Sequence, residues 1–277
     1  MAVPTCRRLS THEELLEAAA GDPFVRWEVR PGSPVEAWAL ADGGVAFVRG
    51  TPSGRRQLTV VGTPDQALPA LRLHLDGLVP SGPRMHRGVT VPHGTLELLG
   101  RDPRIGRGDD WEWMWTAVAP PAHPDVVDLG RGDRDDIAAL LAAASPRHSA
   151  TVEDDGVVGW VGVRDAAGRL LACAAHTEHV PGVPHLASVA THPSARGRGL
   201  GAAVTGTLTR RALAAGAPVV TLGMYSDNPV ARRMYARLGF RAPSQAALMC
   251  ISAVDQAPEA ANVCISAVSP RPGTAPM

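Results

Sequence analysis

A short run of arginines and glycines near the middle of the chain has the composition of an anion-binding turn. It reads Arg196-Gly197-Arg198-Gly199-Leu200-Gly201 and follows an apolar segment at 186–191. Behind it, residues 202–215 carry apolar side chains at helical spacing. A strand, a glycine-rich turn and a helix in this order leave free backbone N–H groups and the positive end of the helix dipole facing the turn. Glycines let a phosphate approach the backbone, and arginines attract it. We interpret the segment as a pyrophosphate-binding turn.

Two classes of phosphate-bearing cofactor use such a turn. Gly197, Gly199 and Ala202 have the G-x-G-x-x-A spacing of dinucleotide-binding folds, which is a weak signal alone. Those folds also place an acidic residue at the end of the next strand, to bind a ribose hydroxyl. The next strand candidate, 219–224, ends without a carboxylate, and Asp227 follows at a helix start. A dinucleotide is therefore the minor alternative.

A second motif points to the other class. Residues 196–201 match the pattern Q/R-x-x-G-x-G/A, and residues 228–240 match N-x-x-A-x-x-x-Y-x-x-L-G-F at every fixed position. The two motifs resemble the signatures of the GNAT superfamily of N-acetyltransferases, in the right order and spacing. The resemblance covers residues 123–250.

This resemblance implies a fold, a co-substrate and a binding site. The fold is α/β (α+β by some schemes), a mixed twisted sheet flanked by helices. The co-substrate is acetyl-coenzyme A, with no metal ion. Pantetheine would lie where the strand ending at 191 splays from the strand at 219–224. The residues expected to bind coenzyme A are Val189, Ala190, Thr191, Arg196, Gly197, Arg198, Gly199, Leu200, Gly201 and Asn228.

Tyr235 is the candidate general acid. An unperturbed tyrosine has a pKa of about 10 and a thiol one of about 8.5, so tyrosine can protonate the departing thiolate. A core tyrosine is the alternative interpretation. Asn228 is a favoured helix N-cap before Pro229, so capping alone would also explain it.

His185 is the candidate general base. It stands where many relatives carry glutamate, and histidine is a competent base at cellular pH. Deprotonation through water is the alternative. Other candidates near this strand are His176, Glu178 and His179. His192, which precedes Pro193, is expected to be structural, and the histidines lack metal-ligand spacing.

The implied activity is acetyl transfer to a primary amine of a small molecule or amino acid derivative. In this superfamily both substrates are generally held together and the amine attacks directly. Loss of the usual glutamate at position 185 leaves a second hypothesis open, a catalytically silent acyl-coenzyme A-binding sensor.

Composition excludes several classes of protein. The 277 residues carry a formal net charge of +0, with no basic excess to suggest a nucleic-acid partner. All 27 cationic residues are arginine, which we attribute to codon bias. The four cysteines are scattered, as in a reducing compartment. Neither a membrane-spanning run nor a signal peptide is evident. We expect a cytoplasmic monomer or homodimer.

The chain divides into two similar halves and a tail. Residues 1–122 read as a helix, three strands, the turn Gly62-Thr63-Pro64 and a helix, which suggests a degenerate copy of the same fold without a phosphate site. Trp111, Trp113 and Trp115 alternate on one strand and face one side, either for packing or as a wall for an apolar acceptor. The Pro-rich segment 119–124 reads as a linker to the catalytic domain at 123–251. The tail at 252–277 is expected to be partly disordered.

Overall fold

The computed structural model describes residues 6–32, 35–50, 56–76, 85–243 and 247–253. The elements of the first half are β1 (Cys6–Leu9), α1 (His12–Ala18), α2 (Pro23–Glu28), β2 (Glu36–Leu40), β3 (Val45–Gly50), β4 (Arg56–Val61), α3 (Pro64–Leu75), β5 (Met85–Pro92), α4 (Thr95–Leu99) and β6 (Ile105–Thr116).

The second half repeats this order with one longer helix in place of α1 and α2. Its elements are β7 (Val127–Leu129), the 3-10 turn η1 (Arg131–Asp133), α5 (Arg134–Ala144), β8 (Val157–Arg164), β9 (Leu170–Val180), β10 (Val183–Thr191), the 3-10 turn η2 (Pro193–Ala195), α6 (Leu200–Ala214), β11 (Val220–Tyr225), α7 (Pro229–Arg237) and β12 (Ala247–Ala253).

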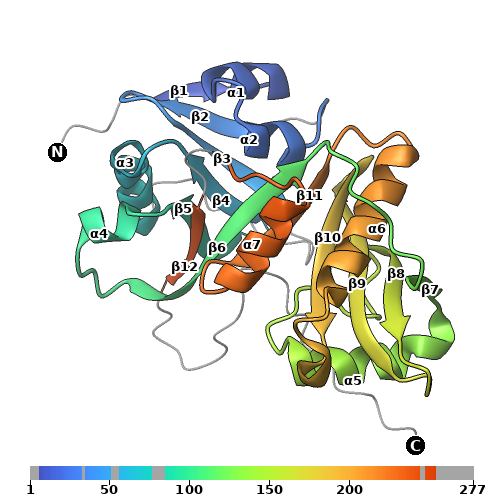
Figure 1. Ribbon diagram of the computed structural model, residues 1–277. Helices are drawn as coiled ribbons and strands as arrows, with labels where there is room; N and C mark the ends of the chain where they lie inside the picture. Colours follow the sequence, from blue (N-terminus) through green and yellow to red (C-terminus); the bar gives the residue numbers. More distant parts are fainter. Residues whose placement is uncertain (1–5, 33–34, 51–55, 77–84, 244–246, 254–277) are drawn as a thin grey trace, which may run out of the picture.

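All these strands form one sheet whose order mirrors itself about its centre. The order is β1-β2-β3-β4-β5-β12-β6-β11-β10-β9-β8-β7. Each half contributes four consecutive antiparallel strands followed by a parallel neighbour, β4 with β5 and β10 with β11. The last strand of each half then crosses over, because β6 pairs with β11 and β12 pairs with β5. The two halves are therefore joined by exchanged strands (Figure 1).

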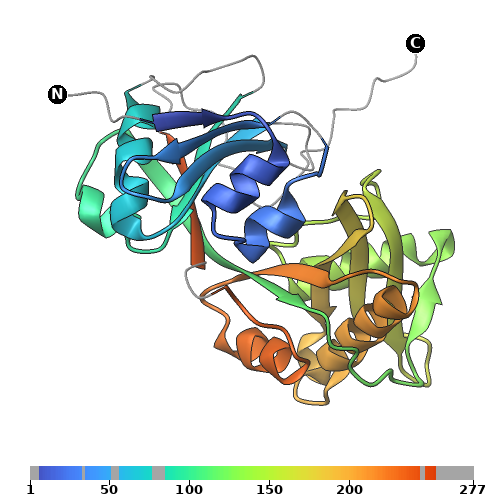
Figure 2. The same cartoon turned by 90° about the horizontal axis from the view of Figure 1, so that it is seen from above.

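Helices cover both faces of the sheet. The helices α1 and α2 pack on the tryptophans of β6, and α5 packs on β8 to β10 on the same face. On the other face, α3 covers the first half, and α6 with α7 covers the second. Figure 2 shows α1 and α2 reaching towards the second half, where α2 lies near β9. This placement brings a helix of the first half to the start of β10.

Local sequence signals explain where several helices begin. Thr11 and Glu14 form a capping box at α1, with the Thr11 hydroxyl accepting the Glu14 N–H at 3.1 Å. At α2, Asp22 accepts the N–H groups of Phe24 and Val25 at 2.8 and 3.2 Å, and Pro23 occupies the first helical position. These caps fix the direction in which each helix leaves its turn.

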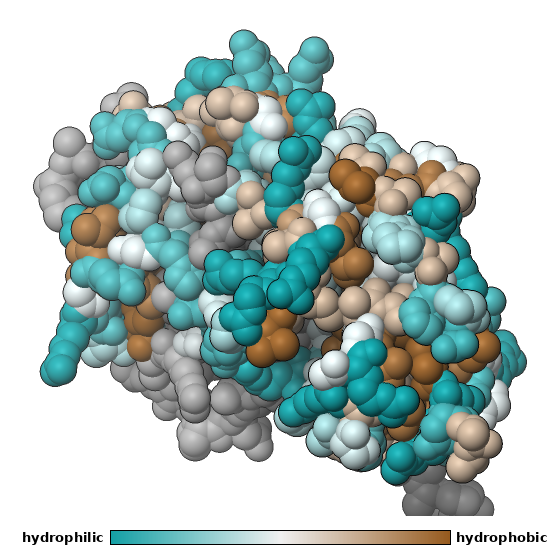
Figure 3. Space-filling model, in the orientation of Figure 1, coloured by the Kyte–Doolittle hydropathy of each residue, from teal (hydrophilic) through white to brown (hydrophobic). Residues whose placement is uncertain are grey.

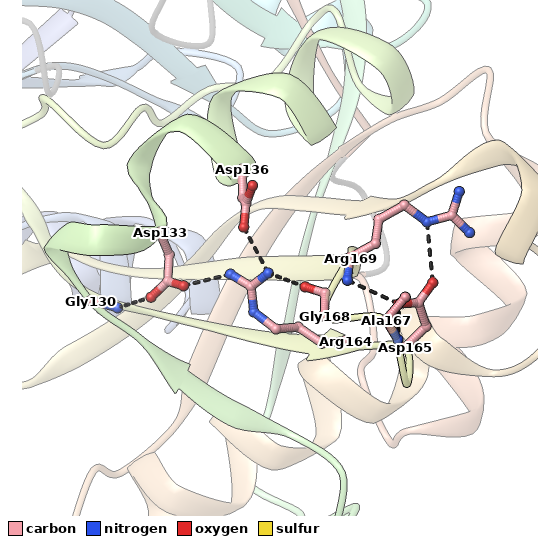
Figure 4. Close-up of polar contacts among 8 residues, drawn as sticks. All are labelled: Gly130, Asp133, Asp136, Arg164, Asp165, Ala167, Gly168 and Arg169. Atoms are coloured by element: carbon pink, nitrogen blue, oxygen red, sulfur yellow. Dashed lines mark hydrogen bonds and ion pairs between the residues drawn. The ribbon is translucent and has the colours of Figure 1, made fainter.

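A charged network fastens α5 to the β8–β9 hairpin (Figure 4). Arg164 at the end of β8 bonds to Asp133 and to Asp136, the latter at 2.7 Å. In the hairpin turn, Asp165 accepts the backbone N–H of Arg169 at 2.9 Å. The carboxylate–guanidinium contacts are charge-assisted and fix the relative positions of helix and hairpin.

Sequence and structure agree on most elements. The three strands expected before the Gly62-Thr63-Pro64 turn are present as β2, β3 and β4, and the strand expected at 219–224 is β11, shifted by one residue, within the usual uncertainty of element ends. The elements β1, α2, α4 and β5 were not expected from the sequence. Residues 254–277 of the expected tail lie outside the described residues. Within the described part of the chain, no helix is long and apolar enough to cross a membrane.

Candidate active site

The glycine turn before α6 is open and its backbone is left-handed. Gly197 and Gly199 both have φ of +77°, a conformation that side chains with a Cβ adopt at a cost. A Cβ built on either residue would meet nothing within 4 Å. Residues 196–199 are exposed. The turn therefore presents bare backbone to solvent, as a phosphate-binding loop requires.

The start of α6 differs from the corresponding start of α3. No side chain caps α6, and the first helical bond runs from the Ala203 N–H to the Gly199 carbonyl. At α3, Thr63 and Gln66 form a capping box, and Gln66 also reaches the Asp42 carbonyl at 2.9 Å. At α3 the N–H groups of Thr63 and Gln66 are thus bonded within the capping box, whereas no side chain caps the amides of α6, which remain available to a ligand.

Strand β10 separates from β11 just before this turn. Their parallel pairing covers only His185 with Thr221 and Leu186 with Leu222. Beyond that point β10 bulges against β9, since Ala187 pairs with Ala175 but Ala190 pairs with Cys173. The expected splay is thus present. It leaves the backbone at 189–191 without a β11 partner, which is where pantetheine was expected.

Ser188 forms the bulge and is a structural residue. It has φ of +50°, and its hydroxyl bonds to both the N–H and the carbonyl of Ala150 at 2.8 Å. Both hydrogen-bonding roles of the hydroxyl are therefore used by the backbone. Ser188 positions the bulge and offers no free nucleophile.

Tyr235 lies on α7 with its ring in the core beneath the splay. Only 5% of the residue is exposed, and its ring contacts Phe240 edge-on at 5.9 Å between centroids. Burial raises the pKa of Tyr235, so the hydroxyl stays protonated at neutral pH. The oxygen has no hydrogen-bond partner within the described part of the protein, yet it is not among the fully enclosed unpaired polar atoms. Its hydrogen is therefore not committed to another group of the described chain.

Asn228 caps α7 as its sequence suggests. Its side-chain oxygen accepts the Ala231 N–H at 3.0 Å. This contact accounts for the residue without a ligand, so a contact to coenzyme A stays a prediction.

His185 lies at the start of the splay and is mostly buried. Its Nδ1 is 2.9 Å from the Thr221 hydroxyl, and its side chain is 13% exposed. Burial, and next the charge of His179, lower the pKa of His185 to about 3, against the attraction of Glu28. The imidazole is therefore neutral at cellular pH and able to accept a proton, but it is a weak base by itself.

A buried carboxylate from the first half lies beside His185. Glu28, the last residue of α2, has a side chain 3% exposed, and one oxygen accepts the Trp113 indole N–H at 2.8 Å. The same oxygen is 3.7 Å from His185 Nδ1, and the other oxygen is 3.7 Å from His179 Nδ1 and 3.8 Å from Arg49. Burial opposes ionisation, but the contact with His179 and the neighbouring positive charges prevail and lower the pKa of Glu28 to about 2.

Sequence reasoning missed Glu28, because it missed the helix that carries it. The signal was present in Asp22-Pro23, an N-cap followed by proline, before the apolar pair Phe24-Val25. No local pattern could show that the end of α2 contacts β10, which lies more than half the chain away in sequence.

The same cluster bears on the expected absence of a metal ion. The ligand atoms of Glu28, His179 and His185 lie within 4.8 Å of one another. Arg49 already supplies a positive charge to Glu28, and a divalent cation here would place further positive charge in a buried space. A carboxylate with two histidines is a donor set that zinc accepts, and the charge of Arg49 opposes a cation there. The expectation of no metal stays a prediction.

The remaining candidate bases have other contacts. Glu178 accepts the Gly182 N–H at 3.2 Å and lies 3.6 Å from His176, whose pKa burial lowers. His192 caps the turn η2 by accepting the Ser194 N–H, as expected for a structural histidine. Of these residues only His179 joins the cluster around His185, where the two rings stack at 4.5 Å.

The tryptophans of β6 serve packing. Trp113 is fully buried and Trp111 is 5% exposed, both against α1 and α2. Trp115 lies under the Arg241 guanidinium, 3.9 Å from its ring centre. The alternative of an aromatic wall for an acceptor is therefore not supported at these positions.

Three arginines lie on the exposed face of α7. This helix packs against the start of α6, since a Cβ on Gly201 would lie 3.2 Å from Met234 Sδ. Its outer face is hydrophilic (Figure 3), with Arg232, Arg233 and Arg237 exposed. Arg232 pairs with Glu112 of β6. Among the described residues, Arg233 and Arg237 have no acidic partner, so both can meet an anionic ligand.

Comparison with known proteins agrees with this geometry. Residues 109–240 match the model of the Acetyltransferase (GNAT) family. A mycothiol acetyltransferase of Nocardia farcinica is 35% identical over 119 residues, which cover 39% of this chain and 37% of that protein. The match thus spans little more than a third of that relative's length.

Solved structures resemble the chain over nearly its whole length. A GCN5-related N-acetyltransferase from Sphaerobacter thermophilus has a TM-score of 0.52 at 16% identity, covering 89% of this chain and 94% of that one. A Drosophila protein has a TM-score of 0.53 at 12% identity, covering 91% and 99%. At these identities the likeness concerns the fold.

The region 109–240 belongs to the GNAT acetyltransferase family, and the chain therefore carries an acyltransferase domain of α/β fold. The family resemblance drawn from the two motifs is confirmed. The matched region begins inside β6, ahead of the linker at 119–124.

Proposed function

We propose that the protein transfers an acetyl group from acetyl-coenzyme A to the primary amine of a small molecule or amino acid derivative. The observation that carries this proposal is the uncapped start of α6 behind two left-handed glycines, at the point where β10 leaves β11. The amides at 196–201 would bind the diphosphate, with Arg196 and Arg198 beside them. The backbone at Val189, Ala190 and Thr191 would bind pantetheine, and Asn228 would lie at the edge of the coenzyme site.

Direct attack by the amine fits the residues near the splay. Holding both substrates together makes the reaction effectively unimolecular, and a backbone N–H in the bulge would polarise the thioester carbonyl. Tyr235 would protonate the leaving thiolate, and His185 would receive the proton of the amine. Burial raises the pKa of Cys173, beneath the bulge, to about 12, so that thiol is a poor nucleophile and an acyl-cysteine intermediate is disfavoured.

We infer that residues 1–122 are a degenerate copy of the catalytic domain at 123–251. The repeated element order and mirrored strand order support this inference. The capped start of α3 indicates that the copy binds no coenzyme A. A single coenzyme site per chain follows.

The proposal also covers the location of the protein and the partners it binds. A formal net charge of +0 gives no electrostatic reason to bind nucleic acid. We therefore expect a cytoplasmic monomer or homodimer acting on a free small molecule.

The test is a thiol-release assay with acetyl-coenzyme A and a panel of amines. The panel includes amino acids, amino sugars, polyamines and the acceptor used by mycothiol acetyltransferase. Calorimetric titration with coenzyme A and with NAD runs in parallel. Tight binding of coenzyme A with amine-dependent thiol release is the expected result. Binding without turnover for every amine would support the sensor hypothesis, and preferred binding of NAD would refute the site assignment.

A further inference from the structure

We propose that Glu28, from the first half of the chain, is a positioning residue for acetyl transfer. Together with Thr221 it holds the hydrogen of neutral His185 on Nδ1, so that Nε2 is free to take the proton of the acceptor amine. This inference rests on the proposed function and adds a residue from outside the matched family region.

The Thr221 hydroxyl can accept a hydrogen bond from His185 Nδ1. It has a single hydrogen, which it can donate to the Pro184 carbonyl at 3.4 Å. Its oxygen also lies 2.9 Å from His185 Nδ1. When this hydrogen is donated to Pro184, the hydroxyl accepts from an Nδ1 that carries a hydrogen; when the hydrogen turns to Nδ1 instead, the other tautomer results. The neighbouring charge of Glu28 decides between the two arrangements.

Glu28 favours the tautomer with the hydrogen on Nδ1. Its carboxylate oxygen lies 3.7 Å from Nδ1, and an N–H dipole pointing at an anion is more favourable than a lone pair. The carboxylate cannot easily turn away, because the same oxygen is fixed by the Trp113 indole N–H at 2.8 Å. Arg49 at 3.8 Å compensates the charge of Glu28 and keeps it ionised.

The other nitrogen of His185 is left for the substrate. Nε2 has no hydrogen-bond partner in the described part of the chain, and it is not among the fully enclosed polar atoms. The stacked His179 ring, 4.5 Å away, limits rotation of the imidazole. A base whose ring plane and tautomer are both fixed needs little reorganisation to accept a proton.

Glu28 also compensates for the low basicity of His185. In the reaction, the amine nitrogen bonds to the thioester carbon as its proton moves to Nε2 and the C–S bond breaks. The imidazolium that results is buried, and burial lowers its pKa, while Glu28 raises it. The carboxylate thus stabilises the charge that forms on His185. The carboxylate that the resemblance leads one to expect on the strand at position 185 is here supplied by α2.

The first test measures the tautomer directly and needs no acceptor. Nitrogen-15 NMR of histidine-labelled full-length protein, with His185→Gln to assign the signal, distinguishes Nδ1–H from Nε2–H imidazole. We expect the Nδ1–H form in the native protein and a mixture in Glu28→Gln. A native Nε2–H form would overturn the proposal, as would an unchanged tautomer in Glu28→Gln.

The second test is kinetic, with any amine that is turned over. Glu28→Gln should lower kcat by about tenfold to 10²-fold, at the lower end of general-base contributions, with the KM for acetyl-coenzyme A unchanged. Asp22→Ala is the matched control, because it removes the α2 cap but keeps the carboxylate. An equal loss of kcat in both variants would make the role of Glu28 structural and refute the proposal. If no amine reacts with the native protein, the proposed function fails while the NMR result still decides the tautomer.

Discussion

Replacing Gly199 by glutamate tests the phosphate-binding turn most sharply, because the chain provides a matched control. Gly199 has φ of +77° and Gly168, in the β8–β9 hairpin, has φ of +82°. A Cβ on either residue would meet nothing within 4 Å. A side chain in this conformation costs about 1–2 kcal/mol, so both variants should lose similar stability, about 2–8 °C in Tm.

Only the variant in the turn should lose affinity for coenzyme A. A carboxylate about 6 Å from a phosphate charge costs about 1–3 kcal/mol at effective dielectric constants between about 80 and 20. Because a diphosphate carries more than one such charge, Kd should rise by at least about tenfold in Gly199→Glu. Gly168→Glu should bind coenzyme A as the native protein does. The measurement is calorimetric titration of both variants, with thermal unfolding to check that their stabilities match.

Two results would refute this reasoning. Native affinity in Gly199→Glu would show that the diphosphate does not lie at the start of α6. An equal loss in both variants would show that affinity follows stability rather than charge in the turn.

Three further predictions concern single groups. Tyr235→Phe should lower kcat by about 10²-fold or more, the range for loss of a general acid, while calorimetry shows coenzyme A binding near normal; an unchanged rate removes Tyr235 from the mechanism. His185 has its folded-state pKa lowered to about 3, so the unfolded chain binds a proton that the folded one does not, and stability should fall as pH drops from about 6.5 towards 3. Denaturant unfolding at several pH values should show a flatter profile for His185→Gln, and an identical slope would contradict the assigned burial. Finally, exposed Cys6 should react with iodoacetamide in the native protein. Buried Cys173, with its pKa raised to about 12, should react only after unfolding. Peptide mass spectrometry measures the labelling, and fast labelling of Cys173 in the native state would contradict the packing under the bulge.

The sequence predicted the elements that depend on local signals. The glycine turn and the Asn228 cap are both set by residues within a few positions of one another. Repeated apolar spacing likewise predicted α6, because a long amphipathic helix has a clear period. These features account for the coenzyme side of the candidate site.

The part of the candidate site around His185 depends on contacts that no local pattern reveals. Glu28 and His185 are far apart in the chain and meet only because α2 packs on the β6 tryptophans next to β10. The role of Trp113 was open for the same reason, since a buried indole needs a partner for its N–H and its partner is Glu28. In the sequence, histidine at position 185 stands where a glutamate was expected. In the structure, α2 brings the carboxylate of Glu28 to the same place.

The exchanged strands explain why the first half matters to a site built mostly by the second. Strand β6 pairs with β11 over residues 111–116, and β11 in turn pairs with β10 at His185. Trp115, Thr221 and His185 therefore stand side by side across three strands, on the face that α2 covers. The linker at 119–124 follows β6 in the chain, so a cut there would separate β11 from the strand that carries Trp113. The first half thus begins α3 with a side-chain cap in place of an open glycine turn, while its helix α2 and strand β6 place Glu28, held by Trp113, beside His185.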